Sequence, residues 1–515
     1  MKKNNQKHLL PLLLLGSLSL TGCTIYDFFP SSSQTASNGV SQSESGDGYY
    51  KASSVLPFSY RDIQRSQSLD AVPSSGDINI LVLPIELSDY EFNSQTLTDL
   101  GVCLNGSGSS ETGYWESLSS FYKKSSYGKL NLTYTVADKY SASYSAQSLY
   151  TYNAGSTGSA PASDLMLEKA VANYKSIHGS GSTQAFDNDS DGQIDGVIMV
   201  YSCPSSYSKT SSTHSIDPEA NLYWAYTFWD YENAYNNKSK SSPIGNLYFW
   251  MSYDFIYEAV SSPSVDPHTL IHESGHMLGL DDYYPSGDGT YGDFNAAGGW
   301  QMMDENILDH DIFSKMALGW AKPYVVTGSC TLDINPSETS GDCILVGTDW
   351  NGTAFDEYML MELYTPTDLN YLDSHTKYSG RQMHYTTYGV KLYHVDARLM
   401  RTTDYSNYSY YSGTSLNTAA YAYLVGATNC SKSYSPADSS FSLLRLISAD
   451  NVNTFENGSL ADEDSLFETG DAFSMAGYSK YFPKGALFDN GKSLGYTINF
   501  DEVASDHAQI TFSAL

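Results

Sequence analysis

Residues 272–282, with the sequence His-Glu-Ser-Gly-His-Met-Leu-Gly-Leu-Asp-Asp, constrain the fold of this chain more than any other segment. Residues four apart lie on one face of a helix, so His272 and His276 can bind one zinc ion together. Glu273 stands next to the first histidine, where it can bond a water at the open position of the ion. Gly279 lacks a Cβ and can take the left-handed conformation that ends a helix, and an acidic side chain three residues on can become a third ligand. The pattern predicts a catalytic zinc site of the hydrolytic kind.

The residues just before the motif predict where its helix begins. Asp266 reads as an N-cap, and Pro267 as the first helical residue. His268 lies one turn before His272 on the same face, so a ligand pair of these two is an alternative. A catalytic glutamate belongs directly after the first ligand, however, and His268 is not followed by one. We therefore expect His268 to be a partly exposed residue, or one that supports the ligands from outside the site.

The extended pattern His-Glu-x-x-His-x-x-Gly-x-x-Asp resembles that of the immune inhibitor A (thuringilysin) family of secreted, metzincin-like bacterial metallopeptidases. The resemblance implies that Asp282, and not Asp281, is the third zinc ligand. Residues 299–304 are similar to the Met-turn of that family, which implies that Met303 lies under the zinc. Further segments that resemble the family are residues 114–130, 314–320, 357–362 and 389–396, so that the resemblance extends from about residue 78 to about residue 400.

The chain also departs from this family pattern. Many metzincins have a tyrosine two residues after the Met-turn methionine, and here that position is Glu305. Oxyanion stabilisation must then come from elsewhere, with Tyr283 and Tyr284 as the nearby candidates. Glu305 also raises the alternative of a downstream glutamate as third ligand, as in gluzincins. Gly279 argues against this, because a gluzincin helix does not need a stop at that position.

The predicted zinc ligands imply a mechanism in which the metal ion activates a bound water and polarises the scissile carbonyl. Glu273 then accepts a proton from the attacking water and returns it to the leaving amine. Residues 245–257 alternate enough to form a strand. Such a strand could lie above the metal and pair with extended substrate, or it could be an ordinary core strand. Both interpretations stay open at this point.

A second acidic segment predicts a calcium site that stabilises the fold. Alternating aspartates with a glycine at the sixth position give converging oxygens and a sharp turn, as in calcium loops. The four predicted ligands are Asp187, Asp189, Asp191 and Asp195. Position twelve is Ile198 instead of the glutamate of an EF-hand, and residues 197–201 read as a strand and not as a helix. The alternative is a solvated acidic turn.

Residues 1–22 predict a lipoprotein signal peptide. The apolar run from residue 9 to residue 20 is shorter than the roughly 20 residues that cross a membrane. Residues 20–23, Leu-Thr-Gly-Cys, have the form of a lipobox, with cleavage before Cys23 and lipid on its sulfur. The alternative is an ordinary signal peptide with a cysteine nearby.

A lipid anchor on Cys23 would place the protein on the cell membrane, facing the extracellular side. Residues 31–47 are rich in Ser, Asn and Gly, which is typical of a flexible linker. We expect residues 23–75 to be a tether that holds the folded part away from the bacterial membrane.

The composition fits an exposed location. Asp and Glu number 58 against 27 Lys and Arg, which gives a net charge of -31 and argues against nucleic-acid binding. Without Cys23 an odd number of cysteines remains, so at most two disulfides form within the chain. Cys330 and Cys343 could close a short hairpin, although the connectivity is not deducible. The remaining cysteines are Cys103, Cys203 and Cys430.

The chain is long enough for two or three domains. We expect an α+β, metzincin-like catalytic domain over residues 76–323 and a β-rich, sandwich-like part over residues 324–515. His394 and Asp396 in the second part are either structural or belong to a further metal or contact site.

The leading hypothesis is a surface-anchored zinc endopeptidase that hydrolyses extracellular proteins, with zinc and structural calcium as cofactors. One alternative is an adhesin or scaffold that keeps a metallopeptidase fold without turnover, against which the intact Glu273 argues. Another is a solute-binding lipoprotein of a transporter, which would have no reason for a zinc triad followed by a Met-turn.

Overall fold

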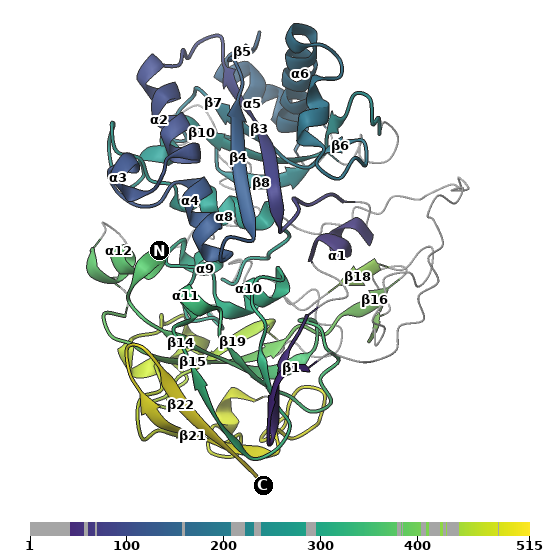
Figure 1. Cartoon of the computed structure of the whole chain (residues 1–515). Helices are drawn as coiled ribbons and strands as arrows, with labels where there is room; N and C mark the ends of the chain where they lie inside the picture. The colour runs from purple at the N-terminus through teal and green to yellow at the C-terminus, as the bar shows by residue number, and fades with distance from the viewer. Residues whose placement is uncertain are drawn as a thin grey trace, which may run out of the picture.

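A computed structural model describes the chain over residues 42–55, 60–66, 69–156, 160–207, 222–230, 238–284, 295–377, 383, 385–402, 408–410, 423–425, 429, 442–482 and 484–515. The expected signal peptide and Cys23 lie outside these residues. Within them the protein combines several β-sheets with helices, as an α+β fold requires (Figure 1). No helix of the described part is both long and apolar enough to cross a membrane.

The first half of the chain forms a sheet with the order β4-β3-β7-β10-β8, to which β5 adds at β3. The strands β4, β3, β7 and β10 run parallel to one another, whereas β8 at the edge is antiparallel to β10. The strands are β3 (Gly76–Glu86), β4 (Leu130–Val136), β5 (Tyr140–Ser141), β7 (Val197–Tyr201), β8 (Tyr226–Trp229) and β10 (Leu247–Ser252).

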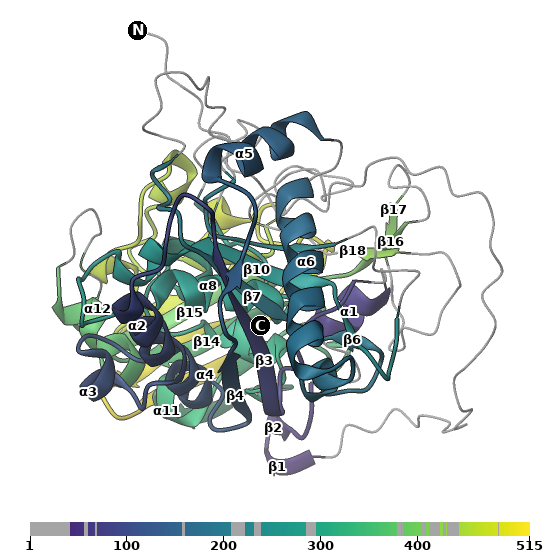
Figure 2. The ribbon, with the colours of Figure 1, turned by 90° about the horizontal axis from the view of Figure 1, so that it is seen from above.

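Helices cover both faces of this sheet, which is why its central strands are apolar on both sides. In β3, Ile80 and Val82 face one hydrophobic core, and Leu81 and Leu83 face another. The first core is covered by α2 (Ser94–Asn105), α4 (Leu118–Ser125) and α8 (His268–Met277), and the second by α5 (Ala146–Gly155) and α6 (Pro161–His178) (Figure 2). The sheet therefore holds α8 firmly on one of its faces.

The second half of the chain is rich in strands, as predicted. A seven-stranded sheet has the order β1-β2-β11-β13-β14-β15-β19, and a four-stranded sheet the order β12-β22-β21-β20. The strands are β1 (Gln42–Gly46), β2 (Tyr49–Ala52), β11 (Tyr324–Val326), β12 (Cys330–Ile334), β13 (Ile344–Val346), β14 (Glu357–Tyr364), β15 (Gly389–Asp396), β19 (Leu444–Ile447), β20 (Ala472–Phe473), β21 (Tyr496–Val503) and β22 (Ala508–Ala514).

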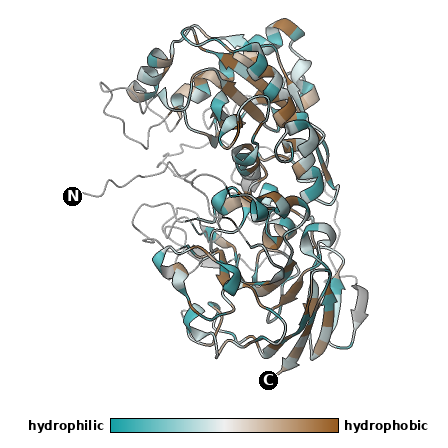
Figure 3. Ribbon diagram, turned by 90° about the vertical axis from the view of Figure 1, so that its left-hand side faces the viewer, coloured by the Kyte–Doolittle hydropathy of each residue, from teal (hydrophilic) through white to brown (hydrophobic). Residues whose placement is uncertain are grey.

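One continuous hydrophobic core includes residues of both halves, and the seven-stranded sheet joins β1 and β2 from the start of the chain to strands after residue 323. Figure 3 shows hydrophobic residues concentrated along the strands of both halves. Shorter elements near the site are α1 (Tyr60–Ser66), α9 (Met302–Glu305), α10 (Ile312–Ala317), α11 (Ser337–Ser340) and α12 (Tyr371–His375).

The prediction of a tether up to residue 75 is wrong for its described part. From residue 42 the segment forms β1 and β2, and β2 pairs with β11 of the second half. Farther along, Val72 donates its N–H to the carbonyl of Met277, and the Trp229 indole donates to the carbonyl of Asp70. The polar composition ends by Gly48, and the tyrosines that follow, Tyr49 and Tyr50, pack on the core.

The sheets decide two further questions that the sequence left open. The strand within residues 245–257 is β10, which lies between β7 and β8 and is buried throughout, so the core-strand interpretation holds. Cys330 begins β12 in the four-stranded sheet, whereas Cys343 precedes β13 in the seven-stranded sheet, and both are free thiols. Cys103 and Cys203 are also free, and Cys430 lies outside the described residues.

Candidate metal centre

The helix α8 carries the histidines of the motif and is buried along its whole length. It begins at His268, one residue later than predicted, so Pro267 is the N-cap. The Asp266 carboxylate still accepts the first helical N–H, that of His268, at 3.1 Å. At the other end Gly279 has φ +98, and Leu280 donates its N–H back to the carbonyl of Gly275 at 3.0 Å. The expected glycine stop is therefore present, and it turns the chain toward the ligands.

Three predicted ligands meet at one point. Asp282 Oδ1 lies 3.0 Å from His272 Nε2 and 3.1 Å from His276 Nε2. In a tetrahedral zinc site with bonds of about 2.0 Å, neighbouring ligand atoms are about 3.3 Å apart. The two distances from Asp282 to the imidazoles are thus close to the ligand spacing of such a site. Glu273 offers a carboxylate oxygen within 4.8 Å of both imidazoles.

Backbone carbonyls orient both imidazoles for this role. His272 Nδ1 lies 2.8 Å from the carbonyl oxygen of Met302, and His276 Nδ1 lies 2.9 Å from that of Leu280. A carbonyl can only accept, so each Nδ1 carries the proton that it donates. Each Nε2 faces the common centre, so it is the nitrogen that would bind a metal ion once its proton is displaced.

The electrostatics of the cluster suit a cation. Burial opposes protonation of His276, yet the Asp282 carboxylate raises its pKa to about 10. The same contacts hold the pKa of Asp282 well below its usual range despite its burial. Without a metal ion the cluster is therefore a buried ion pair, and metal binding would displace a proton. Burial raises the pKa of Glu273, and its Oε2 is buried without a hydrogen-bond partner among the described residues.

Met303, the predicted Met-turn residue, packs directly under α8. A Cβ built on Gly275, the residue just before His276, would lie 2.4 Å from Met303 Sδ. The turn is tied to the ligand loop as well, because Tyr283 donates its N–H to the Met303 carbonyl at 2.8 Å. His310 lies beside Met303 under α8, with its Cε1 3.5 Å from the Cβ position of Gly275, and burial lowers its pKa well below the usual value.

The two tyrosines considered for oxyanion stabilisation have different surroundings. The Tyr283 hydroxyl lies 2.8 Å from Ser314 Oγ in the core, so this residue is no longer a candidate. The ring of Tyr284 lies 6.2 Å from that of His272, and Tyr284 remains a candidate for oxyanion stabilisation. Glu305 is exposed at the end of α9, whereas Asp282 contacts both histidines, so the geometry does not favour the gluzincin alternative.

His268 is fully buried, and the expectation of partial exposure is wrong. Its Nδ1 lies 2.6 Å from Asp266, and its Nε2 lies 3.2 Å from both carboxylate oxygens of Asp373 in α12. Burial opposes protonation, but the two carboxylates raise the pKa of His268 to about 9. His268 thus fixes the start of α8 from outside the metal centre.

Thr227 in β8 is a residue of the site that the sequence did not single out. Its Oγ1 donates to the backbone carbonyl of Glu273 at 2.9 Å, so the edge strand lies beside α8. In the antiparallel strands β8 and β10, opposite residues alternate between hydrogen-bonded and non-hydrogen-bonded pairs. Asp230 donates its N–H to the Asn246 carbonyl, which shows which pairs are the hydrogen-bonded ones. By this alternation the N–H and C=O groups of Thr227 and Trp229 point away from β10. The only sequence signal was the short alternating run of β8.

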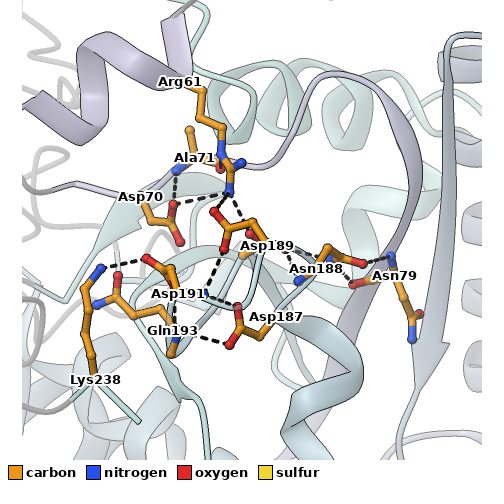
Figure 4. A network of polar contacts seen from close by, with 12 residues as sticks. Arg61, Asp70, Ala71, Asn79, Asp187, Asn188, Asp189, Asp191, Gln193 and Lys238 are labelled. Carbon is orange, nitrogen blue, oxygen red and sulfur yellow. Dashed lines mark hydrogen bonds and ion pairs between the residues drawn. The ribbon is translucent and has the colours of Figure 1, made fainter. Parts of the chain in front are cut away.

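The acidic loop is only partly as predicted (Figure 4). Carboxylate oxygens of Asp187, Asp189 and Asp191 lie within 4.8 Å of one another, but Asp195 does not belong to this group. Its Oδ1 contacts Arg61 at 2.8 Å, and its Oδ2 accepts from the N–H and the side-chain amide of Asn188 at 2.8 and 2.6 Å. Asp195 therefore holds the loop in place from behind.

Two cations already border this loop. Arg61 lies 3.1 Å from Asp189, and Lys238 lies 2.7 Å from Asp191. Asp187 accepts the N–H groups of Asp191 and Gly192 at 2.9 and 3.0 Å, which closes the sharp turn. The strand β7 follows, as the sequence predicted.

Comparison with known proteins adds no family to this description, since no protein-family model and no curated protein matches the chain.

Proposed function

We propose that this chain is a zinc-dependent endopeptidase that hydrolyses peptide bonds of extracellular proteins. The observation that carries the proposal is the convergence of His272, His276 and Asp282 beside the unpartnered Oε2 of Glu273. A bound zinc ion supplies Lewis-acid polarisation of the scissile carbonyl and lowers the pKa of water to about 7. The resemblance to immune inhibitor A peptidases and the place of Met303 under α8 support a metzincin-like catalytic domain.

Glu273 carries the proton in this mechanism. Its free oxygen accepts a proton from the attacking water and then returns it to the leaving amine nitrogen. Burial raises the pKa of this carboxyl, which makes the protonated form easier to reach midway through the reaction. Thr227 holds the backbone of Glu273, and Tyr284 is the residue proposed to stabilise the oxyanion.

Substrate binding is assigned to β8. The outward main-chain groups of Thr227 and Trp229 can pair with an extended peptide, because β8 is the edge of the sheet among the described residues. A peptide bound there would lie next to α8, with its scissile bond near the ligands. Backbone pairing of this kind recognises unfolded or extended segments of many sequences.

We also propose two supporting features. A calcium ion bound by Asp187, Asp189 and Asp191 stabilises the loop before β7. Lipid on Cys23 anchors the protein to the cell membrane, facing the extracellular side, and no nucleic acid is a partner of so acidic a chain.

The test is cleavage of a generic unfolded protein by the wild type, by Glu273→Gln and by Glu305→Gln. We expect chelator-sensitive cleavage by the wild type, loss of at least about a hundredfold in Glu273→Gln, and normal cleavage by Glu305→Gln. Zinc content is measured in all three and is expected to be equal. Cleavage by Glu273→Gln at the wild-type rate would overturn the mechanism, and a folded wild type that binds no zinc would point to a binding protein instead.

A further inference from the structure

A second buried cluster lies in the seven-stranded sheet, away from the proposed active site. Glu357 begins β14 and lies opposite Asp396 of β15, while His394 lies opposite Met359. Alternate residues of a strand share a face, so Glu357, His394 and Asp396 project from the same side of the sheet. For His394 and Asp396, the sequence analysis gave a structural role and a further metal or contact site as alternatives.

The segment before β21 covers this face. The rings of Phe482 and Phe488 lie 5.3 and 5.5 Å from the His394 ring. Asp489 and Asn490 donate their N–H groups to Glu357 Oε1 and Oε2, at 2.5 and 2.8 Å. The cluster is therefore closed off from solvent, and Glu357 is fixed by the segment above it.

Three donor atoms approach one another inside this enclosure. His394 Nε2 lies 3.0 Å from Glu357 Oε1, and atoms of Glu357, His394 and Asp489 all lie within 4.8 Å of one another. Asp489 is 3% exposed, and its Oδ1 has no hydrogen-bond partner among the described residues. A buried carboxylate oxygen without a partner is costly, and a cation is one way to satisfy it.

Asp396 is not part of this donor set, because Arg398 takes both of its carboxylate oxygens at 2.7 Å. Arg398 also lies 3.3 Å from Glu357 Oε2, which is the oxygen on the other side from His394. The arginine therefore neutralises Asp396 and the far side of Glu357. Glu357 Oε1, His394 Nε2 and Asp489 remain facing one another.

We propose that Glu357, His394 and Asp489 bind a divalent metal ion of the zinc type, which fastens the segment before β21 to the seven-stranded sheet. An imidazole with two carboxylates suits such an ion better than calcium, which prefers oxygen ligands alone. The ion would replace the hydrogen bond between His394 and Glu357. This role is structural and independent of peptide hydrolysis.

The test uses the full chain with His272→Ala and His276→Ala, which removes the first centre. This background protein is stripped with a chelator and titrated with Zn²⁺ alone, and bound zinc is measured by competition with a chromophoric chelator. We expect one zinc per chain and a higher melting temperature with zinc. A folded background protein that binds no zinc would overturn the proposal.

The ligand assignment is tested by adding Asp489→Asn to the same background. We expect zinc affinity to fall by at least about tenfold, while the control Asp396→Asn keeps it, since Asp396 is held by Arg398. Undiminished zinc binding in Asp489→Asn would overturn the assignment. If Asp489→Asn does not fold, His394→Gln takes its place with the same expectation.

Discussion

The indole of Trp115 lies flat against the imidazole of His268, with ring centres 3.9 Å apart and planes 1° from parallel. Asp266 and Asp373 hold the same imidazole in its plane from either edge. The two carboxylates raise the pKa of His268 to about 9, so the ring is charged at neutral pH. One buried cation thus joins the start of α8 to α12 and to the segment before α4.

This arrangement predicts a loss of stability at alkaline pH. The folded-state pKa of His268 is above the usual value of about 6.5, so its stabilisation is complete below pH 6.5. The contribution, about 3 kcal/mol, is lost as the pH rises through about 9. Asp373→Asn should reduce the dependence of the free energy of unfolding on pH in this window. Urea denaturation at several pH values checks this.

A matched control for this prediction is Asp506→Asn. Asp506 lies 2.9 Å from His507, but this pair is exposed at the surface. We expect the control to leave the pH dependence between 6.5 and 9 as it is in the wild type. An Asp373→Asn profile equal to that of the wild type would contradict the assignment of the charge to His268.

Gly279 should tolerate no side chain. Its φ is +98, and a Cβ would lie 2.8 Å from Tyr60 Cβ. Gly319, just after α10, has φ +79 and open space around its Cβ position. Gly319→Ala therefore measures only the cost of a side chain in a left-handed backbone conformation, about 1–2 kcal/mol. We expect Gly279→Ala to be less stable than Gly319→Ala in urea, and to bind zinc more weakly because Asp282 follows three residues later. Equal effects of the two substitutions would contradict this.

Thr227 offers a test of substrate pairing at β8. Thr227→Pro removes a main-chain donor that points away from β10, so the ladder between β8 and β10 should survive. Thr227→Val keeps this donor and loses only the hydroxyl that bonds the Glu273 carbonyl. We expect KM for an extended peptide to rise about 2- to 10-fold more in Thr227→Pro than in Thr227→Val. The same KM in both variants would remove Thr227 from the substrate-pairing assignment.

Calcium should raise the melting temperature of the chelator-treated protein. A ligand at one hundred times its Kd stabilises the folded state by about 2.7 kcal/mol. Asp189→Asn removes a carboxylate from the loop and should abolish the rise. Asp349→Asn, which changes an exposed residue paired with Lys492, should keep it. No rise in the wild type would mean that Arg61 and Lys238 alone neutralise the loop.

Local sequence pattern was enough to predict the elements that position the proposed metal centre. The run of residues 197–201 forms β7, and the spacing of His272, His276 and Gly279 corresponds to α8 and its stop. These features depend on residues close in sequence, where helical and strand periodicity decide the structure.

Contacts between residues far apart in the chain could not be predicted from the sequence. Nothing near Asp195 indicates that Arg61 will take one of its oxygens, and nothing near His268 indicates Asp373. The edge position of β8 likewise depends on the order of strands in the sheet and not on the composition of β8. A charged side chain finds its partner only once the sheets have formed, so this part of the site required the structure.

The hairpin of β1 and β2 has a consequence for how the protein would fold after the proposed export. In the proposed export, residues 42–52 would be among the first to reach the far side of the membrane, but the partner of β2 is β11, and Lys51 meets Tyr324 273 positions later. The edge of β2 that does not pair with β1 would then lack its partner until most of the chain has arrived. Closing this edge would be a late folding step, completed within a short reach of the lipid surface.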